Sequence, residues 1–428
     1  MKFEAPRGTQ DVLESEQPKW RYVISQFEEL CDLYGYKRIE TPVFEDTELF
    51  VRTSGIGSDV VSKEMYTFED RRGRSLTLRP EATAPIVRAY FNHGLHREVQ
   101  PQKLYTVATI YRYGRPQKGR FREHRQLDVE AIGSDDPAID AEVIQLYAEL
   151  LKRVGVLESD YHLELNSIGD QNCRPQYIRD ELGPWLEKHF KDLDEETREQ
   201  AARNPLRVLD NILAKPPAVR ELLWTAPAIG DFLCPACEQH FSEVRAYLKS
   251  YSVNYKLVPT LVRGLDYYTR TTWEFVGPEG GSQSTLSGGG RYDGLAEQLG
   301  APPTPGVGFG AGVERLLIAL GPAAHQRPSS GIDVYFAFDT SAREDAALRQ
   351  RVLAEFKAAR DLGLSTVTDY AYRSLNSQFD QAHKLDARLV VIVWGSGAGG
   401  VTIRRHRGDE WPVSIQGLAE TLFKELRT

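Results

Sequence analysis

Two segments of alternating apolar and polar residues, 102–112 and 127–133, most constrain how this chain can fold. An alternation of period two is typical of a strand with one buried face. Residues 112–125, which separate them, contain six arginines or lysines and a single acid, Glu123. The sequence therefore predicts a long antiparallel hairpin whose tip is strongly cationic.

One sign of charge concentrated in this way suggests contact with phosphates, although the whole chain has a net charge of −8. Gln126 and Glu130 are separated by an even number of residues, so we expect them to share a face of the returning strand. Arg112, at the end of the first strand, can hold a phosphate or carboxylate through two hydrogen bonds. A surface hairpin with solvated charges is the alternative for this segment taken alone.

Several other segments show helix or strand periodicity. We expect helices at 18–35, 140–151 and 313–320, and extended segments or strands at 36–45, 75–79, 161–166, 254–268 and 272–276. Pro42 suggests that its segment is an edge or interface strand, because proline cannot donate to a central ladder. Residues 171–250 are charged, have helical periodicity and contain several prolines. We interpret them as a helical insertion that contributes nothing to a pocket.

The carboxy-terminal part is expected to be a separate domain, which agrees with a length of 428 residues. Residues 321–331 are rich in proline, serine and glycine and predict a linker. Beyond it, strands at 332–338 and 389–394 alternate with a helix near 342–362 and a final helix. This order predicts an α/β unit around a partly parallel sheet.

The four cysteines, Cys31, Cys173, Cys234 and Cys237, are too few for a disulfide scaffold. Cys234 and Cys237 have the spacing of a metal or redox pair. A zinc site normally needs a second pair or close histidines, and only His240 is near in sequence. We expect reduced structural thiols and no metal ligands.

The sequence contains no run of about 18 apolar residues, so no membrane span is expected. The amino terminus has no apolar signal core and carries acids. We expect a cytoplasmic location.

Two short motifs are candidates for ligand contact. Glu81 and Thr83 follow a strand and precede a helix, so they either cap that helix, the interpretation favoured by the motif alone, or receive a substrate ammonium group. The glycine-rich run 305–312 precedes Arg315 and predicts an exposed backbone at a helix start, which is a general phosphate-binding device. It fits neither the Walker loop nor the dinucleotide motif, and a strained or interfacial turn is an equal alternative.

Arginines, phenols and bare glycine backbone are concentrated at 263–270 and 287–294. Arg263, Tyr267 and Tyr268 are expected near the end of a strand, and Arg291 and Tyr292 follow three glycines. Tyrosines on an apolar strand are often core residues. Here their arginine and glycine neighbours favour a pocket for a small polar ligand beside a phosphate.

Five blocks, in order, resemble those of histidyl-tRNA synthetases, which are class II aminoacyl-tRNA synthetases. They are Leu78-Arg-Pro-Glu, Arg115-Pro-Gln-Lys-Gly-Arg, Leu165-Asn-Ser-Ile-Gly, Leu261-Val-Arg-Gly-Leu-Asp-Tyr-Tyr and Gly289-Gly-Arg-Tyr-Asp-Gly-Leu. The resemblance covers essentially the whole chain. It implies an α+β fold: an antiparallel sheet with flanking helices in a catalytic core at 1–170 and 254–325, a helical insertion at 171–253, and an α/β anticodon-binding domain at 331–428. It also implies a homodimer formed through the first helix and the Pro42 strand.

The implied reaction joins L-histidine to ATP, with Mg²⁺, to form histidyl-adenylate and pyrophosphate, and then transfers histidine to the 3′ end of histidine tRNA. The residues implied to act in the reaction are Arg263, at the α-phosphate, Arg112 and Gln126. Those implied to bind histidine are Glu81, Thr83 and Gln126 at the α-amino group, Glu130 and Tyr268 at the imidazole, and Tyr267 and Tyr292 nearby. Those implied for ATP are Arg112, Arg120 and Arg315, and those implied for tRNA are Arg115 and Gln117.

The chain departs from the family pattern at Gly114, where an acid is common, and at Glu123-His124-Arg125, where Gln-Phe-His is usual. A contact expected from that acid is therefore in doubt. Arg404, Arg405 and Arg407 are either phosphate contacts or a solvated edge. Two other functions compete: a non-catalytic regulatory paralogue in histidine biosynthesis, and a nucleotide-dependent ligase that acts without tRNA.

Overall fold

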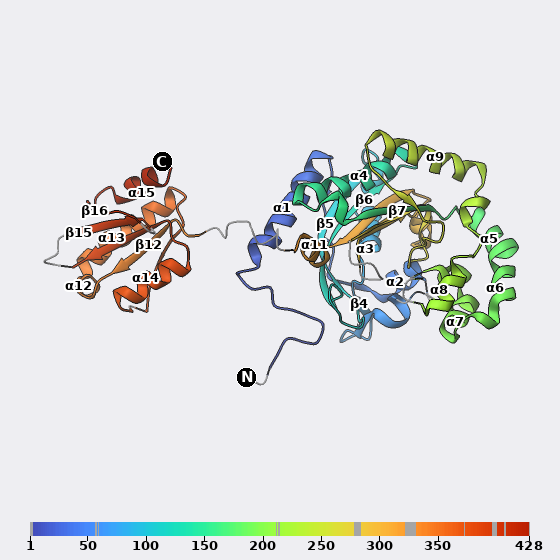
Figure 1. Cartoon of the computed structure of the whole chain (residues 1–428), viewed down its shortest axis with the longest axis horizontal. Helices are drawn as coiled ribbons and strands as arrows, with labels where there is room; N and C mark the ends of the chain where they lie inside the picture. Colours follow the sequence, from blue (N-terminus) through green and yellow to red (C-terminus); the bar gives the residue numbers. More distant parts are fainter. Residues whose placement is uncertain are drawn as a thin grey trace. The chain divides into compact units, whose positions relative to one another are not determined.

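The computed structural model describes residues 3–55, 58, 60–210, 212, 215–277, 284–321, 331–371, 373–395, 400–405 and 408–427. The chain divides into two compact units, Met1–Arg327 and Pro328–Thr428 (Figure 1). Most of the predicted linker at 321–331 lies outside the described residues. Among those that are described, no helix is long and apolar enough to cross a membrane.

The larger unit contains an eight-stranded sheet with central antiparallel strands and one parallel pair at each edge. Its order is β1 (Lys37–Arg38), β5 (Gln102–Tyr111), β6 (Glu123–Ile132), β11 (Gly306–Gly312), β10 (Thr285–Arg291), β9 (Thr269–Val276), β7 (His162–Ser167) and β8 (Lys256–Leu257). Strands β5 and β6 pair antiparallel, with Ala108 opposite Gln126. The predicted hairpin with a basic tip is confirmed.

Helices cover one face of this sheet, where alternate residues of β6, such as Leu127 and Val129, enter an apolar core. The helices are α1 (Gln17–Leu33), α4 (Pro137–Val154), α9 (Pro235–Ser250) and α11 (Val313–Leu320). Figure 1 shows α1, α4 and α9 along this side. Helix α1 ends just before Gly35, as predicted.

The other face of the sheet carries α3 (Thr83–Asn92) and a second apolar core that includes Tyr267, Tyr268 and Tyr292. A small antiparallel sheet lies beside it, formed by β2 (Phe44–Asp46), β4 (Ser75–Leu78) and β3 (Tyr66–Glu69). The remaining short elements here are α2 (Thr47–Ser54), η1 (Val60–Glu64), η2 (Leu95–Arg97) and α10 (Leu295–Gln298). On the opposite side, η3 (Glu158–Asp160) connects α4 to β7.

The predicted insertion is helical and leaves the sheet after β7. Its elements are α5 (Cys173–Tyr177), η4 (Ile178–Leu182), α6 (Gly183–His189), η5 (Phe190–Asp192), α7 (Glu195–Arg203), η6 (Pro205–Leu209), α8 (Pro217–Leu223) and η8 (Ile229–Phe232). Helix α9 then returns to the sheet, where Val244 and Leu248 join the core beside α4.

Two expectations about local structure in the larger unit are wrong. Residues 258–268, which include Arg263 and Tyr268, form a loop between β8 and β9 and not a strand. Their apolar spacing reflects burial of Val262, Tyr267 and Tyr268 in the second core. The glycine-rich run 306–312 is a strand, β11, and not an open turn.

The smaller unit is an α/β domain with a five-stranded sheet, as predicted. Its order is β13 (Thr366–Thr368), β12 (Val334–Phe338), β14 (Leu389–Trp394), β15 (Gly400–Arg405) and β16 (Glu410–Val413), the first three parallel and the last two antiparallel. Its helices are α12 (Thr340–Glu344), α13 (Ala346–Asp361), α14 (Leu375–Lys384) and α15 (Leu418–Arg427). The helix expected near 342–362 is two helices that meet at Asp345, whose carboxylate caps α13 by accepting from Leu348 N.

Candidate active site

A cavity of about 520 Å³ opens on the face of the large sheet that carries α3. It is lined by the β5–β6 hairpin, the 258–268 loop, strands β9–β11, the start of α11 and part of the insertion. The predicted residues that line it are Glu81, Thr83, Arg112, Arg120, Gln126, Arg263, Tyr267, Tyr268 and Arg315. Segments far apart in sequence therefore meet in one pocket.

Buried carboxylates gather at one end of the cavity. Glu81 caps α3, because its carboxylate accepts from Thr83 N at 2.6 Å and from Ala84 N at 3.1 Å. Asp128 lies between Gln126 and Glu130 on the cavity face of β6 and accepts from Gln126 Nε2. Its other oxygen, Oδ2, is buried without a hydrogen-bond partner among the described residues. Glu81 thus does what the motif alone predicts and still faces the cavity.

The pKa values of these three carboxyl groups are raised, so they keep their protons to a higher pH than exposed acids do. Burial, with a further contribution from Glu81, raises the pKa of Asp128 to about 7. Burial also raises the pKa of Glu81 and of Glu130, and Asp128 adds to the effect on Glu130. A cation bound here would reduce the repulsion between the carboxylates and give Asp128 Oδ2 a partner.

Glu130 and Tyr292 lie directly below the cavity and do not line it. Thr83 Oγ1 donates to Glu130 Oε1 at 2.6 Å, and the Tyr292 hydroxyl donates to Glu130 Oε2. Tyr267 packs against Tyr268 and Tyr292, with ring centroids 4.7 and 6.0 Å apart. Five of the residues implied to bind histidine therefore form one connected group, of which Thr83, Tyr267 and Tyr268 line the cavity.

Five arginines line the cavity, and four of them, Arg112, Arg120, Arg263 and Arg315, lie close together in its other part. Arg112 donates to Pro80 O at 2.7 Å and Arg315 to Gly119 O at 2.9 Å. Arg263 pairs with Glu274, and Arg120 pairs with Glu64. Backbone and acid contacts thus fix the directions of all four.

The guanidinium groups repel one another. Burial lowers the pKa of Arg315, and the charges of Arg112, Arg120 and Arg263 lower it further. Glu274 is the acid that opposes this effect. Such a cluster favours a ligand with more than one negative charge, such as a polyphosphate.

The glycines of β10 and β11 leave space for the site. A Cβ at Gly288 would overlap the guanidinium of Arg263, and one at Gly308 would overlap the carboxylate of Glu130. At Gly290 it would lie 2.7 Å from Cδ1 of Tyr268. The role of these glycines is close approach of functional side chains to a strand, and not an exposed loop around a phosphate.

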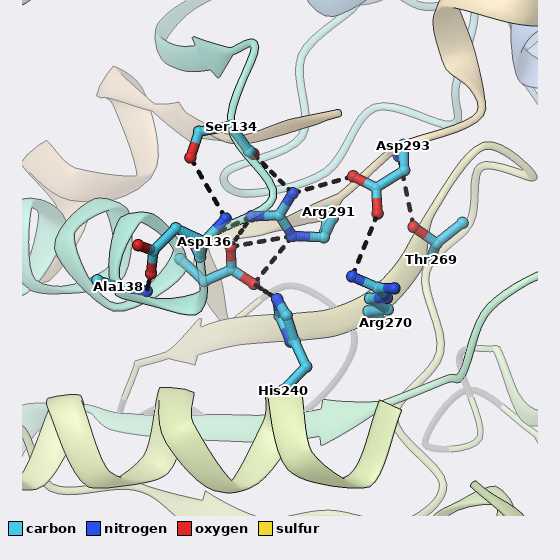
Figure 2. A network of polar contacts seen from close by, with 9 residues as sticks. Ser134, Asp136, Ala138, His240, Thr269, Arg270, Arg291 and Asp293 are labelled. Atoms are coloured by element: carbon cyan, nitrogen blue, oxygen red, sulfur yellow. Dashed lines mark hydrogen bonds and ion pairs between the residues drawn. The ribbon is translucent and has the colours of Figure 1, made fainter. Parts of the chain in front are cut away.

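Arg291 does not belong to the pocket, contrary to its grouping with Tyr292 in the sequence. Its side chain is fully buried and pairs with Asp140 of α4 and, at 2.9 Å, with Asp293 (Figure 2). His240 on α9 lies 3.6 Å from Asp140. This network joins β10, α4 and α9 on the far side of the sheet and is structural.

Arg115 and Gln117 are exposed at the hairpin tip, away from the cavity. Gly114, the departure from the family pattern, is buried against Arg120, and a Cβ there would lie 2.8 Å from Arg120 Nε. Below the tip, Arg125 N donates to Glu314 at 2.9 Å. His124 is partly buried and stays neutral, because loss of solvent around its ring and the charges of Arg112 and Arg315 lower its pKa to about 3.

The site includes residues that the sequence analysis missed. Asp128 could have been found, because it shares its strand face with Gln126 and Glu130. Arg207 and Asp210 of the insertion line the cavity, so the expectation that the insertion contributes nothing is wrong. Arg207 also pairs with Asp266 at 2.8 Å, and no local signal marks this contact, because it depends on how the insertion folds back.

His240, the histidine nearest in sequence to Cys234 and Cys237, is not beside them in the structure. His240 contacts Asp140, whereas Cys234 and Cys237 lie beside Cys173 and Asp170. All four cysteines are free thiols.

Comparisons with known proteins agree with these motifs. The sequence profile of the family described as Histidyl-tRNA synthetase matches residues 8–316. The chain is 45% identical over 394 residues to the histidine–tRNA ligase of Caldanaerobacter subterraneus subsp. tengcongensis, covering 92% of each chain. It is 42% identical over 428 residues to that of Halothermothrix orenii, covering 99% of this chain and 100% of the relative.

Solved structures give the same picture. The apo histidyl-tRNA synthetase of S. aureus superposes with a TM-score of 0.78 at 32% identity, covering 98% of this chain and 99% of that one. An ATP phosphoribosyltransferase regulatory subunit/histidyl-tRNA synthetase from Bacillus halodurans C superposes with a TM-score of 0.64 at 25% identity, covering 93% and 100%.

Proposed function

Because the chain belongs to the histidyl-tRNA synthetase family, we propose that its cavity is the place where L-histidine reacts with ATP. The protein is an ATP-dependent histidine–tRNA ligase, and the regulatory paralogue is not favoured. The assignment of single residues to steps of the reaction is our proposal.

The observation that carries this proposal is the opposite charge of the two parts of one cavity. Three carboxylates, those of Glu81, Asp128 and the deeper Glu130, mark one end. Four guanidinium groups mark the other, and the two acids paired with them, Glu64 and Glu274, leave an excess of positive charge. Histidine has an ammonium group and an imidazole, and ATP carries a triphosphate. An ammonium group at the first end and phosphates at the second would remove both repulsions.

At the acidic end, Glu81, Thr83 and Gln126 hold the α-amino group, and the ionised Asp128 lies close enough to share its charge. Tyr268, which lines the cavity, and Glu130, which lies just below it, bracket the imidazole, with Tyr267 beside them and Tyr292 supporting Glu130 from beneath. An amino acid of similar shape without the two imidazole nitrogens would leave buried polar groups of the site unpaired. Such a site discriminates against that amino acid by a factor on the order of 10⁴ to 10⁵, so an editing step is unnecessary.

At the basic end, an oxygen of the histidine carboxylate attacks the α-phosphorus of ATP. The new bond joins that oxygen to phosphorus, and the bond to the bridging oxygen breaks, so pyrophosphate leaves with the electron pair. Arg263 and Arg112 stabilise the charge that develops on the α-phosphate, and Arg120 and Arg315 hold the outer phosphates. Mg²⁺ bound with ATP would neutralise phosphate charge, and Glu274, which lines the cavity and pairs with Arg263, would offer it a carboxylate oxygen.

The second step attaches histidine to the 3′ ribose of histidine tRNA. Arg115 and Gln117 are exposed at the hairpin tip and are proposed to contact this tRNA. We assign anticodon binding to the smaller unit, where a hollow is lined by Phe379, His383, Arg404 and other residues. The Arg404 guanidinium lies 5.3 Å from the Phe379 ring centroid, an arrangement suited to unstacked bases. Arg407 lies outside the described residues.

A homodimer and a cytoplasmic location belong to the same proposal. The segment after Pro42 exposes apolar side chains: Val43 is 41% and Phe44 50% exposed, and Phe68 on the same small sheet is 44% exposed. Apolar side chains gathered on one surface are typical of an interface, which supports dimer formation through this segment.

The direct test is ATP–pyrophosphate exchange with Mg²⁺ and each of the twenty amino acids supplied singly. Exchange with histidine alone is expected. Exchange with no amino acid would contradict the proposal. Charging of histidine tRNA in a second assay separates this enzyme from a ligase that acts without tRNA, which would form the adenylate and leave tRNA uncharged.

A further inference from the structure

Four potential metal ligands meet at the base of the insertion, outside the catalytic cavity. Asp170 and Cys173 lie where the chain leaves β7, and Cys234 and Cys237 lie where it returns at the start of α9. One ligand atom from each residue lies within 4.8 Å of all the others. The thiols of Cys173 and Cys237 are buried, whereas Asp170 and Cys234 are partly exposed.

The local backbone directs these side chains toward one point. Gly169 has φ +66°, and a Cβ there would lie 2.6 Å from the Cβ of Cys173, so the tight turn needs glycine. Asp170 Oδ1 accepts from Asn172 N at 2.8 Å and Cys173 N at 3.0 Å. These bonds orient Oδ2 toward Cys234, whose Sγ is 4.0 Å away.

The thiols are also supported by backbone donors. Cys234 N donates to Cys173 Sγ at 3.1 Å, across a separation of 61 residues in sequence. Cys234 is the N-cap of α9 and Cys237 lies in its first turn, where the helix dipole favours thiolates. Burial raises the pKa of Cys173 and Cys237, and this amide hydrogen bond orients the Cys173 sulfur toward the other ligands.

We propose that Cys173, Cys234, Cys237 and Asp170 form a structural zinc site. A zinc tetrahedron with bonds of about 2.3 Å to sulfur and about 2.0 Å to carboxylate oxygen places its ligand atoms roughly 3.5 to 3.8 Å apart. The four groups need only small side-chain adjustments to reach this geometry. Binding displaces the thiol protons into water, so the site takes zinc more tightly as pH rises.

The position of the site gives it a mechanical role. It joins the first and last segments of the insertion, and Arg174, next to Cys173, donates to Tyr268 O at 2.8 Å. Zinc would therefore fix the insertion, which supplies Arg207 and Asp210 to the cavity, relative to a tyrosine of the proposed histidine site. A Cys234–Cys237 disulfide is the competing state, and it would leave Cys173 and Asp170 without a shared ligand.

The test compares metal content in three full-length proteins: the wild type, Cys234→Ala and Cys31→Ala. Cys31 is the remaining cysteine and is buried in the core on the inner side of α1, so it serves as the matched control. Each protein is reduced, supplied with Zn²⁺ and freed of loose metal before mass-spectrometric analysis. We expect one zinc per chain in the wild type and in Cys31→Ala, and at least about tenfold weaker retention in Cys234→Ala, because loss of supporting groups alone already costs that much.

Two further measurements protect the test against misfolding of the alanine variant. Co²⁺ in the wild-type protein should give the visible absorption of a tetrahedral thiolate site. Asp170→Cys should hold zinc at least about tenfold longer against a chelator, because it completes the common four-cysteine set. Failure of the reduced wild type to bind either Zn²⁺ or Co²⁺ would overturn the proposal. Equal zinc content in all three proteins would do the same, as would a Cys234–Cys237 disulfide that persists when zinc is present during purification.

Discussion

Asp128 lowers the stability of the unliganded protein at neutral pH, and a bound cation would offset this cost. Its carboxyl group is 1% exposed, and its pKa is raised from 3.8 to about 7. Because the folded protein holds this proton more tightly than the unfolded chain does, the free energy of unfolding is highest at low pH. It falls as pH rises from about 4 through 7. At pH 8 the folded protein therefore bears the full cost of the buried charge.

Asp128→Asn should remove that cost. We expect the unliganded variant to be more stable than the wild type by roughly 1 to 3 kcal/mol at pH 8, and by clearly less at pH 5.5. Urea unfolding at the two pH values measures the difference. Asp135→Asn, an exposed acid close in sequence, should show no such dependence. A pH-independent change in Asp128→Asn would contradict the assigned burial cost.

Arg263 is the residue whose loss should separate chemistry from binding. Its guanidinium faces the basic end of the cavity, 5.7 Å from the ring centroid of Tyr268. Arg263→His should lower the histidine-dependent exchange rate by about 10² to 10³, because a donor placed for the transition state is lost. Calorimetric binding of histidine should remain measurable. Exchange at the wild-type rate would remove Arg263 from the reaction.

At the scale of elements, the bare strands β10 and β11 connect the fold to the site. Gly308 pairs opposite Glu130, and a side chain at Gly308 would overlap both the Glu130 carboxylate and the Val129 carbonyl. Gly308→Ala should therefore displace Glu130, weaken histidine binding and cost about 1 to 3 kcal/mol of stability. Gly294→Ala is the control, because a Cβ there meets no atom within 4 Å and φ is −91°. Thermal unfolding and the KM for histidine in the exchange assay measure both effects; equal values for the two variants would contradict this role.

The same strands show what a sequence can and cannot predict. The β5–β6 hairpin and helix α1 follow from local periodicity, because each has one buried face of constant spacing. The apolar spacing of residues 258–268 predicts a strand, but they form a loop, because they are buried by contact with the insertion and α3 and not by strand pairing. Arg207 and Cys173 could not be assigned from sequence for a related reason: their partners, Asp266 and Cys234, are 59 and 61 residues away. The site residues implied by resemblance were available only through the order of motifs.

At the scale of the whole molecule, charge is distributed unevenly. The chain has a net charge of −8, yet the hairpin tip carries exposed Arg115 and Lys118. A polyanion such as tRNA is repelled by most of an acidic surface, so a local cationic tip favours one orientation of approach. Each phosphate contact also releases a counterion, which makes association depend on salt.

Arg115→Ala tests this orientation. We expect kcat/KM for charging histidine tRNA to fall, and its log–log dependence on salt concentration to become shallower by about one unit, because one phosphate contact is lost. Pyrophosphate exchange without tRNA should not change, since Arg115 does not line the cavity. Lys152→Ala, an exposed cation in the last turn of α4, is the matched control and should leave both assays unaltered. If Arg115→Ala reduced exchange and charging equally, the tip would act on the catalytic pocket and not on tRNA. The division of the larger unit into a charged tip for tRNA and a separate cavity for adenylation would then fail.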